Sequence, residues 1–209
     1  MLKVGLTGGV ACGKSTVGEM FVRLGAHLVK ADEIAHELMS PGQDVYDRVV
    51  AAFGPEILNA DGTINRPALA DKVFPTGRIA ELNAIVHPAV IASQDAWMET
   101  QFRRNPETVA MVEAALMLES GSYKRFDRMI TVVCTFEQKV ERYARRHHLD
   151  LAQAKAEVER RMKAQATDEA KIKISDYVVD NSGPLAGTEL QVERIWGELH
   201  LISCSNVPG

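Results

Sequence analysis

The first thirty residues alternate between short apolar runs and one amphipathic segment. Lys3–Thr7 is typical of a short buried strand, and apolar residues recur at helical spacing through 14–24. Gly25 is a typical helix stop, and His27–Lys30 predicts a second strand. A strand, a crossover helix and a second strand form a βαβ unit, so this pattern predicts a parallel sheet.

Residues 33–107 have a mainly helical pattern with no obvious strand. The amphipathic segments lie near 44–53, 67–73, 78–86 and 89–103. The pair His87-Pro88 is a candidate helix break, because the residue before a proline is biased away from the α region. We therefore expect a helical lobe beside the sheet.

The remaining third of the chain returns to strands and helices. Apolar runs predict three further strands at 108–112, 129–134 and 177–179. Capping-box patterns at 135–138 and 150–153 predict two helix starts. The last predicted helix covers 190–199, and we expect the tail after Ile202 to be frayed.

The composition is that of one globular α/β domain. The 209 residues are 46% hydrophobic and 25% charged, with a net charge of -4, so the basic excess of a nucleic-acid-binding protein is missing. No apolar run approaches the roughly 20 residues of a membrane helix. The first apolar run is too short for a signal peptide, and the three cysteines lack ligand spacing. We expect a cytoplasmic protein with reduced thiols and no nucleic-acid or membrane partner.

A phosphate-binding loop follows the first predicted strand. Residues 8–16 read GGVACGKST and match the pattern G-x-x-x-x-G-K-[ST] between a strand and a helix, which disfavours a mere glycine turn with an exposed lysine. Such a loop points backbone amides at an anion. The Lys14 ammonium should reach the β- and γ-phosphates, and the Ser15 hydroxyl should ligate Mg²⁺. We expect ATP to be bound by Gly8, Gly9, Ala11, Cys12, Gly13, Lys14, Ser15 and Thr16.

Asp32 follows the second predicted strand, at the sheet edge where ligands bind in open parallel sheets. A carboxylate there can accept a proton from an attacking hydroxyl, or hold Mg²⁺ through water. The same residue type also suits the N-cap of a helix beginning near Ile34. The two roles are compatible, and we take Asp32 as the candidate catalytic base.

An arginine-rich segment at 136–165 has eight Lys or Arg against five Asp or Glu. Arg142 and Arg146 are four residues apart on a predicted helix and share a face. Arginine suits the spread charge of phosphoryl transfer. A solvated helical face is the alternative, but a small kinase needs a basic lid that excludes water.

Together these motifs resemble the dephospho-CoA kinase family over about residues 1–200. The P-loop alone is shared by many kinases, and the more particular pieces are LNAIVHP at 82–88 and RMKAQAT at 161–167. The resemblance implies an α/β, three-layer P-loop NTPase fold with a five-stranded parallel sheet, a helical acceptor-binding lobe and a helical lid. It implies a core at about 1–40, 106–136 and 166–205, a CoA-binding lobe at about 41–105 and a lid at about 137–165.

The resemblance also implies a reaction, in which ATP phosphorylates the ribose 3′-hydroxyl of dephospho-CoA with Mg²⁺ to give coenzyme A and ADP. Carried over by position, Asp32 resembles the base, Lys14 the phosphate lysine, and Arg142 and Arg146 the lid arginines. Asn181 resembles a residue on the adenine side of the nucleotide. Positions associated with the acceptor are Arg66, His87 and Glu119. We expect a monomer, with a small homo-oligomer as the alternative.

Three positions depart from the family pattern. Ala11-Cys12 replaces the usual Gly-Ser, where only backbone is needed, and Ala115 stands where proline is usual. Lys30 replaces an aspartate two positions before Asp32. Strand alternation would place these two side chains on one face, so Lys30 is expected to pair with Asp32 or with a phosphate.

Three rival functions remain. Kinases of nucleotides, shikimate or gluconate would share the fold with a different acceptor lobe. A GTPase switch would need an N-K-x-D motif, which the chain does not have. An ATP-binding protein without catalysis would not need Lys14, Ser15 and Asp32 together.

Overall fold

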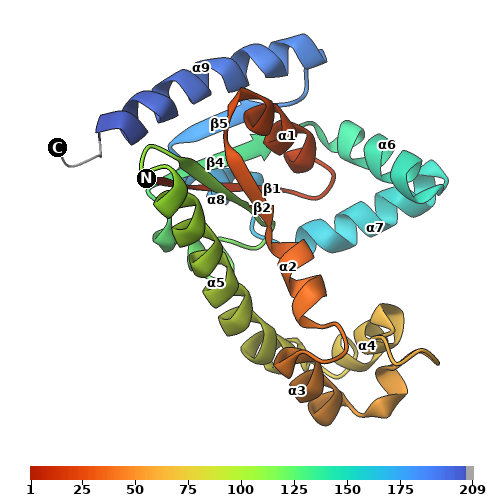
Figure 1. The fold of residues 1–209 in the computed structure, drawn as a ribbon. Helices are drawn as coiled ribbons and strands as arrows, with labels where there is room; N and C mark the ends of the chain where they lie inside the picture. Colours follow the sequence, from red (N-terminus) through yellow and green to blue (C-terminus); the bar gives the residue numbers. More distant parts are fainter. Residues whose placement is uncertain (206–209) are drawn as a thin grey trace. The chain divides into compact units, whose positions relative to one another are not determined.

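The computed structural model describes residues 1–205, and these divide into two compact units. The sheet unit consists of Met1–Leu28 and the chain from Thr100 onward, and the helical unit is Val29–Glu99. Figure 1 shows the elements of both units along the chain. No helix within residues 1–205 has the length and apolarity to cross a membrane.

Five strands form one sheet in the order β2-β3-β1-β4-β5. Strand β1 pairs in parallel with β3 and with β4, and β4 pairs in parallel with β5. Each strand lies within one residue of the predicted bounds, which confirms the expected five-stranded sheet. The strands are β1 (Leu2–Gly8), β2 (His27–Lys30), β3 (Val109–Glu113), β4 (Arg128–Val133) and β5 (Tyr177–Asp180).

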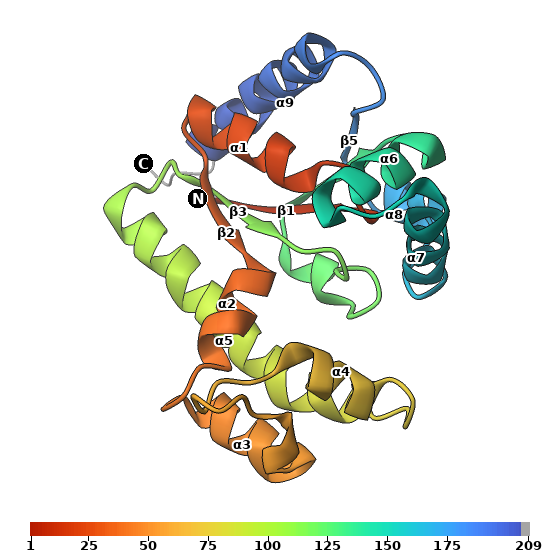
Figure 2. The same cartoon turned by 90° about the vertical axis from the view of Figure 1, so that its right-hand side faces the viewer.

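The helices of the sheet unit bury the apolar residues that the sequence placed at helical spacing. Helices α1 and α9 pack against each other and cover one face of the sheet (Figure 2). Phe21 of α1 and Ile195 of α9 are fully buried in this core, together with Leu6 of β1 and Ile130 of β4. The helices are α1 (Lys14–Leu24), α6 (Phe136–His147), α7 (Leu151–Lys163), α8 (Asp168–Lys173) and α9 (Leu185–Ser205), with a 3₁₀ turn at Ser122–Arg125.

Local end signals in the sequence are confirmed. Gly25 ends α1 in a left-handed conformation with φ 114°, and its N–H bonds back to the carbonyls of the last turn. Both predicted capping boxes are present, with Thr135 at the start of α6 and Asp150 at the start of α7. These signals involve only neighbouring residues, so they can be recognised in the sequence.

The helical unit has its own apolar core, which includes Val49, Phe53 and Ile57. Apart from the last two residues of β2, an isolated bridge between Leu58 and Ile64 is the only strand-like pairing among its described residues. This unit is mainly helical and overlaps the predicted lobe at about 41–105, whose bounds and role stay predictions. Its elements are α2 (Ala31–Leu38), α3 (Asp44–Phe53), a 3₁₀ turn at Pro55–Ile57, α4 (Arg66–Val73) and α5 (Ile79–Arg104), which continues into the sheet unit.

Two helix predictions in this unit are wrong. The segments 78–86 and 89–103 form one helix, because α5 accommodates Pro88 instead of breaking there. Helix α2 starts at Ala31 and not near Ile34, with Lys30 as its N-cap. Asp32 therefore lies in the first turn of a helix, and strand alternation does not apply to it.

Two further expectations concern the ends of helices. The Lys30 ammonium donates to the Glu33 carboxylate at 3.1 Å, and its expected pairing with Asp32 or with a phosphate stays a prediction. Helix α9 continues past Ile202 to Ser205, and residues 206–209 lie outside the described part of the chain.

Candidate functional site

The loop between β1 and α1 is closed by tight backbone packing. A Cβ atom at Gly8 would lie 2.3 Å from the Val132 carbonyl oxygen, and one at Gly13 would lie 2.2 Å from the Asn181 side-chain nitrogen. Gly13 also has a φ of 94°, which disfavours other residues. Both glycines of the motif are therefore required by the structure, as the sequence pattern predicts.

Lys14 rises from the start of α1 and turns back over the loop. Its Nζ donates to the carbonyl oxygens of Gly8 at 3.1 Å and Gly9 at 3.0 Å. The ammonium group is thus held over the loop that is expected to bind phosphates. Thr16, two residues further along α1, is exposed.

Ser15 points to a carboxylate that the sequence analysis did not single out. Its Oγ donates to Glu113 Oε1 at 2.8 Å, and Glu113 ends strand β3 next to β1 in the sheet. The other oxygen, Oε2, is buried and has no hydrogen-bond partner among residues 1–205. The signal available in the sequence was an acidic residue directly after the strand predicted at 108–112.

Oxygen ligands and an unpartnered buried carboxylate oxygen fit a divalent cation. Mg²⁺ prefers oxygen ligands and is usually held by one or two protein groups, with water and phosphates completing its shell. Ser15 and Glu113 offer a hydroxyl and a carboxylate side by side. The residues at this place are therefore compatible with the expected metal.

The far end of the loop is braced by Asn181 and Arg142. Asn181 Nδ2 donates to the Cys12 carbonyl at 2.9 Å, and its Oδ1 accepts from the Thr188 hydroxyl at 3.0 Å. Arg142 donates to the Cys12 carbonyl at 3.3 Å and to the Asn181 carbonyl at 2.9 Å. Both ends of the Asn181 amide thus contact protein, so this side chain supports the loop, and its adenine-side role stays a prediction.

Of the two predicted lid arginines, the structure brings one to the loop. Arg142 is half-buried against it, whereas Arg146 is exposed and makes no hydrogen bond or ion pair within residues 1–205. Cys12 is fully buried, so its thiol fills space beneath the loop. Burial also raises the pKa of the Cys134 thiol to about 11, which makes this cysteine a poor nucleophile.

Glu119 lies in the turn after β3 and is tied to neighbouring backbone. Its Oε1 accepts the Ala166 N–H at 2.6 Å and lies 3.7 Å from the Lys171 ammonium. Burial lowers the pKa of Lys171, and the negative charge of Glu119 opposes that effect. Its predicted acceptor-side role is not tested by these contacts.

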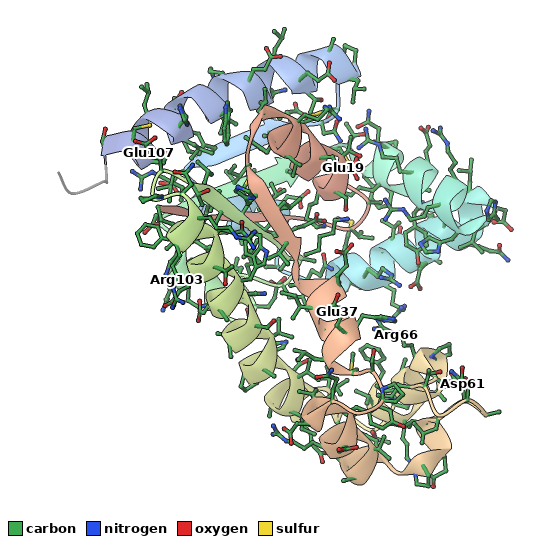
Figure 3. All side chains as sticks on the ribbon, viewed as in Figure 1. Glu19, Glu37, Asp61, Arg66, Arg103 and Glu107 are labelled. Atoms are coloured by element: carbon green, nitrogen blue, oxygen red, sulfur yellow. The ribbon has the colours of Figure 1, made fainter. Side chains whose placement is uncertain are left out.

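The helical unit carries a depression of its own, with about 330 Å³ of empty space that is partly open to solvent. Arg66, labelled in Figure 3, opens α4, and its guanidinium contacts the Nδ1 atom of His36 on α2. His36 follows Asp32 by four residues, so the two share a side of α2; this i,i+4 spacing was a signal that the sequence analysis missed. The depression is lined by His36, Met39, Ser40, Pro41, Thr63, Ile64 and Arg66.

The other two predicted residues of the helical unit differ in exposure. Asp32 is exposed in the first turn of α2. His87 is half-buried within α5 and does not line the depression, and burial lowers its pKa. A neutral imidazole is therefore favoured at His87.

The arrangement supplies two chemical capabilities. The sheet unit has a glycine-rich backbone cradle with an ammonium group and an arginine, which suits a polyphosphate. The helical unit has an arginine, a histidine and hydroxyl groups around a partly apolar hollow, which suits a polar small molecule.

Comparison with known proteins points to one family. The sequence model of the dephospho-CoA kinase family matches residues 2–187. Dephospho-CoA kinase of Aquifex aeolicus is 38% identical over 200 residues, covering 95% of this chain and 98% of the relative. Dephospho-CoA kinase of Moorella thermoacetica is 37% identical, covering 95% and 92%.

Solved structures agree on the fold. Dephospho-CoA kinase from Campylobacter jejuni is 25% identical, with a TM-score of 0.68 and coverage of 98% of both chains. The protein TT1252 from Thermus thermophilus is 27% identical, with a TM-score of 0.75, covering 95% of this chain and 97% of its own. Shikimate kinase from Acinetobacter baumannii in complex with shikimate has a TM-score of 0.50 at 12% identity over 100% and 96% of the chains, which is a likeness of fold alone.

Proposed function

Because the chain belongs to the dephospho-CoA kinase family, we propose that it transfers the terminal phosphoryl group of ATP to the ribose 3′-hydroxyl of dephospho-CoA, giving coenzyme A and ADP. The observation that carries this proposal is the intact phosphate-binding loop. Lys14 is held over its carbonyls, and Ser15 is bonded to a buried carboxylate. Phosphoryl transfer needs little covalent chemistry from a protein, so positioning and charge are the properties to expect.

Each group at the loop has a distinct part in this proposal. Backbone N–H groups of the loop and the N-terminus of α1 bind the phosphates, and Lys14 neutralises charge at the β- and γ-phosphates. Arg142 reaches the loop from α6 and adds a second cation. Arg146 is exposed, and we keep it as a proposed lid arginine on the basis of the family resemblance.

The proposed metal site consists of Ser15 and Glu113. The Ser15 hydroxyl would ligate Mg²⁺, and the Glu113 carboxylate would hold it directly or through water. Bound Mg²⁺ supplies charge neutralisation between the phosphate oxygens. The unpartnered Oε2 of Glu113 supports this assignment, because a buried carboxylate oxygen is costly without a partner.

Asp32 is the proposed general base. Its carboxylate is exposed at the start of α2 and is free to accept the proton of the attacking 3′-hydroxyl. Glu33, the next residue, is occupied by the Lys30 ammonium. This difference favours Asp32 over its neighbour as the base.

The depression beside Arg66 is the proposed contact for the acceptor. A guanidinium group suits the diphosphate of dephospho-CoA, and Ser40 and Thr63 offer hydroxyls to an amide-containing chain. We keep His87 and Glu119 as proposed acceptor-side residues on the basis of the family resemblance. We also propose that the protein is a monomer and that it acts in the cytoplasm. Its three free cysteines support the second of these proposals.

A coupled assay of ADP release tests the proposal. Dephospho-CoA should drive ADP release from MgATP, whereas adenosine, AMP and shikimate should not. Lys14→Met should abolish the signal, and Cys204→Ser, an exposed thiol on α9, is the matched control that should retain it. If AMP or shikimate drove ADP release as fast as dephospho-CoA or faster, dephospho-CoA would be rejected as the acceptor.

A further inference from the structure

Two lysine side chains are buried in the sheet unit and have no part in the function proposed above. Lys139 of α6 is 2% exposed and forms an ion pair with Asp168, the first residue of α8. Lys171 of α8 is 0% exposed and faces Glu119. An ammonium group taken out of water costs several kcal/mol unless it is well paired, so two such pairs in one place call for an explanation.

The Lys139–Asp168 pair lies directly against the phosphate-binding loop. A Cβ atom at Gly9 would lie 3.0 Å from Asp168 Oδ1 and 3.2 Å from Lys139 Nζ. A side chain at Gly9 would therefore crowd the two charged groups, which lie beside the loop backbone. The ammonium and the carboxylate together form the wall of the loop at this glycine.

This wall is at the end of the loop where the terminal phosphates are expected. Lys14 Nζ rests on the carbonyl oxygens of Gly8 and Gly9, and this lysine is the group that reaches the β- and γ-phosphates. The pair thus supports the backbone next to the phosphoryl group that would be transferred. Since the Asp168 carboxylate neutralises the Lys139 ammonium, the positive charge of Lys14 is the one that remains for the phosphates at the Gly9 end of the loop.

Helix α6 contacts both ends of the loop with side chains three residues apart. The Lys139 ammonium lies beside Gly9, and Arg142 donates to the Cys12 carbonyl at 3.3 Å. Residues at this spacing share one face of a helix. One face of α6 therefore holds the loop from its first residues to its last, and Asp168 connects that face to α8.

We propose that the Lys139–Asp168 ion pair is a positioning pair for phosphoryl transfer, which fixes the Gly9 end of the loop to α6 and α8. The inference rests on the proposed kinase activity. Its physical basis is that small misplacements of reacting groups are costly for catalysis even where binding survives. The alternative is that the pair only contributes to folding.

Paired substitutions separate these two roles. Asp168→Asn leaves the buried Lys139 ammonium unpaired, and Lys139→Met leaves the half-buried Asp168 carboxylate unpaired, so each should lower the melting temperature. The double variant removes both charges and should recover most of that loss, because neutral replacements of a buried pair are often tolerated. A positioning role predicts that its turnover does not recover with its stability.

The experiment compares melting temperature, kcat and nucleotide affinity in the wild type, the two single variants and the double variant. We expect the double variant to stay about tenfold or more below the wild type in kcat, as expected for lost positioning. Its affinity for ATP, measured by calorimetry without acceptor, should fall more than its affinity for ADP, because the γ-phosphate is the group affected. Arg128→Met/Asp176→Asn is the control for removing an ion pair elsewhere in the sheet unit, since that more exposed pair, 3.8 Å apart, lies at the amino end of β4, away from the loop.

The outcomes are distinguishable from one another. A double variant with restored stability, wild-type kcat and an unchanged preference between ATP and ADP overturns the positioning role. If the wild type forms no coenzyme A, dephospho-CoA is rejected as the acceptor. The difference between the affinities for ATP and ADP, measured by calorimetry, then still decides whether the pair acts on the terminal phosphate. A loss shared equally by the control pair would also overturn the inference.

Discussion

Ala11 holds a backbone conformation that glycine would adopt more easily. Its φ is 53°, in the left-handed region, at a position where the family usually has glycine. A residue with a Cβ pays roughly 1–2 kcal/mol there. The sequence comparison could show the substitution, but only the structure shows that it carries backbone strain.

Ala11→Gly should therefore stabilise the protein. Glycine relieves the strain but has greater freedom in the unfolded chain, so we expect a net gain of up to about 1 kcal/mol, or a melting temperature about 2–4 °C higher. Calorimetry measures this directly. Ala152→Gly, at an exposed position in α7, is the matched control and should move the melting temperature downward.

The role of Asp32 as the general base can be tested by a single substitution. Asp32→Asn keeps the size of the side chain but removes the proton acceptor, so kcat should fall by about 10²–10⁴. The KM for ATP should change little, because the substitution is outside the phosphate loop. Steady-state kinetics decides this, with Glu33→Gln in the same helical turn as the control; near-normal turnover of Asp32→Asn would remove it as the base.

Some site residues could be found from sequence and others could not. The P-loop residues share one continuous motif, so Gly13, Lys14 and Ser15 were identified correctly as parts of one loop. Glu113 was missed because its contact with Ser15 spans 98 residues and depends on which strand neighbours β1. The bracing of Cys12 by Asn181 spans 169 residues and is equally invisible to local patterns.

At the scale of elements, the α6–α7 hairpin is held by a small polar network. Glu157 of α7 accepts hydrogen bonds from Arg160 and from Arg161, and it contacts the Tyr143 hydroxyl of α6 at 3.5 Å. The Arg161 guanidinium also lies over the Tyr143 ring, 5.4 Å from its centroid. Hydrogen bonding by Arg160, and then by Arg161, lowers the pKa of Glu157 to about 2.

This network predicts a pH-dependent contribution to stability. Because the pKa of Glu157 is lower in the folded state, its contribution is complete above the unfolded pKa of about 4.3 and is lost as pH falls toward 2. The pair is near the surface, so about 1 kcal/mol is expected after solvent screening. Glu157→Gln should melt about 2–4 °C below wild type at pH 7, and the difference should shrink below pH 4.3.

The control for that series is Glu159→Gln, an exposed carboxylate in the same helix. Its melting temperature should follow the wild type at every pH. A Glu157→Gln difference that stays constant down to pH 3 would show that the network does not depend on the charge of Glu157.

Element boundaries were predictable where the signals are local. The capping boxes of α6 and α7 and the glycine stop of α1 involve residues within one turn, and they were confirmed. The start of α2 and the continuity of α5 through Pro88 were wrong. In both places packing in the helical unit overrides a weak local preference, as the burial of Ile34 and Val86 in its core shows.

At the scale of the whole molecule, the fold class followed from one βαβ unit and its loop. A P-loop between a strand and a helix requires a parallel sheet, and the five predicted strands were found. The strand order β2-β3-β1-β4-β5 could not be predicted from the sequence, because it depends on pairings between distant segments. The division into a sheet unit and a helical unit places the proposed base and the phosphate loop in different units.

The most direct test of the proposed kinase activity identifies which atom of the product carries the new phosphate. The purified chain is incubated with MgATP and dephospho-CoA, and the product is examined by phosphorus NMR and mass spectrometry. The account predicts one new phosphomonoester on the ribose 3′-oxygen for each ADP formed. A phosphate on another atom, or ADP accompanied only by inorganic phosphate, would contradict it.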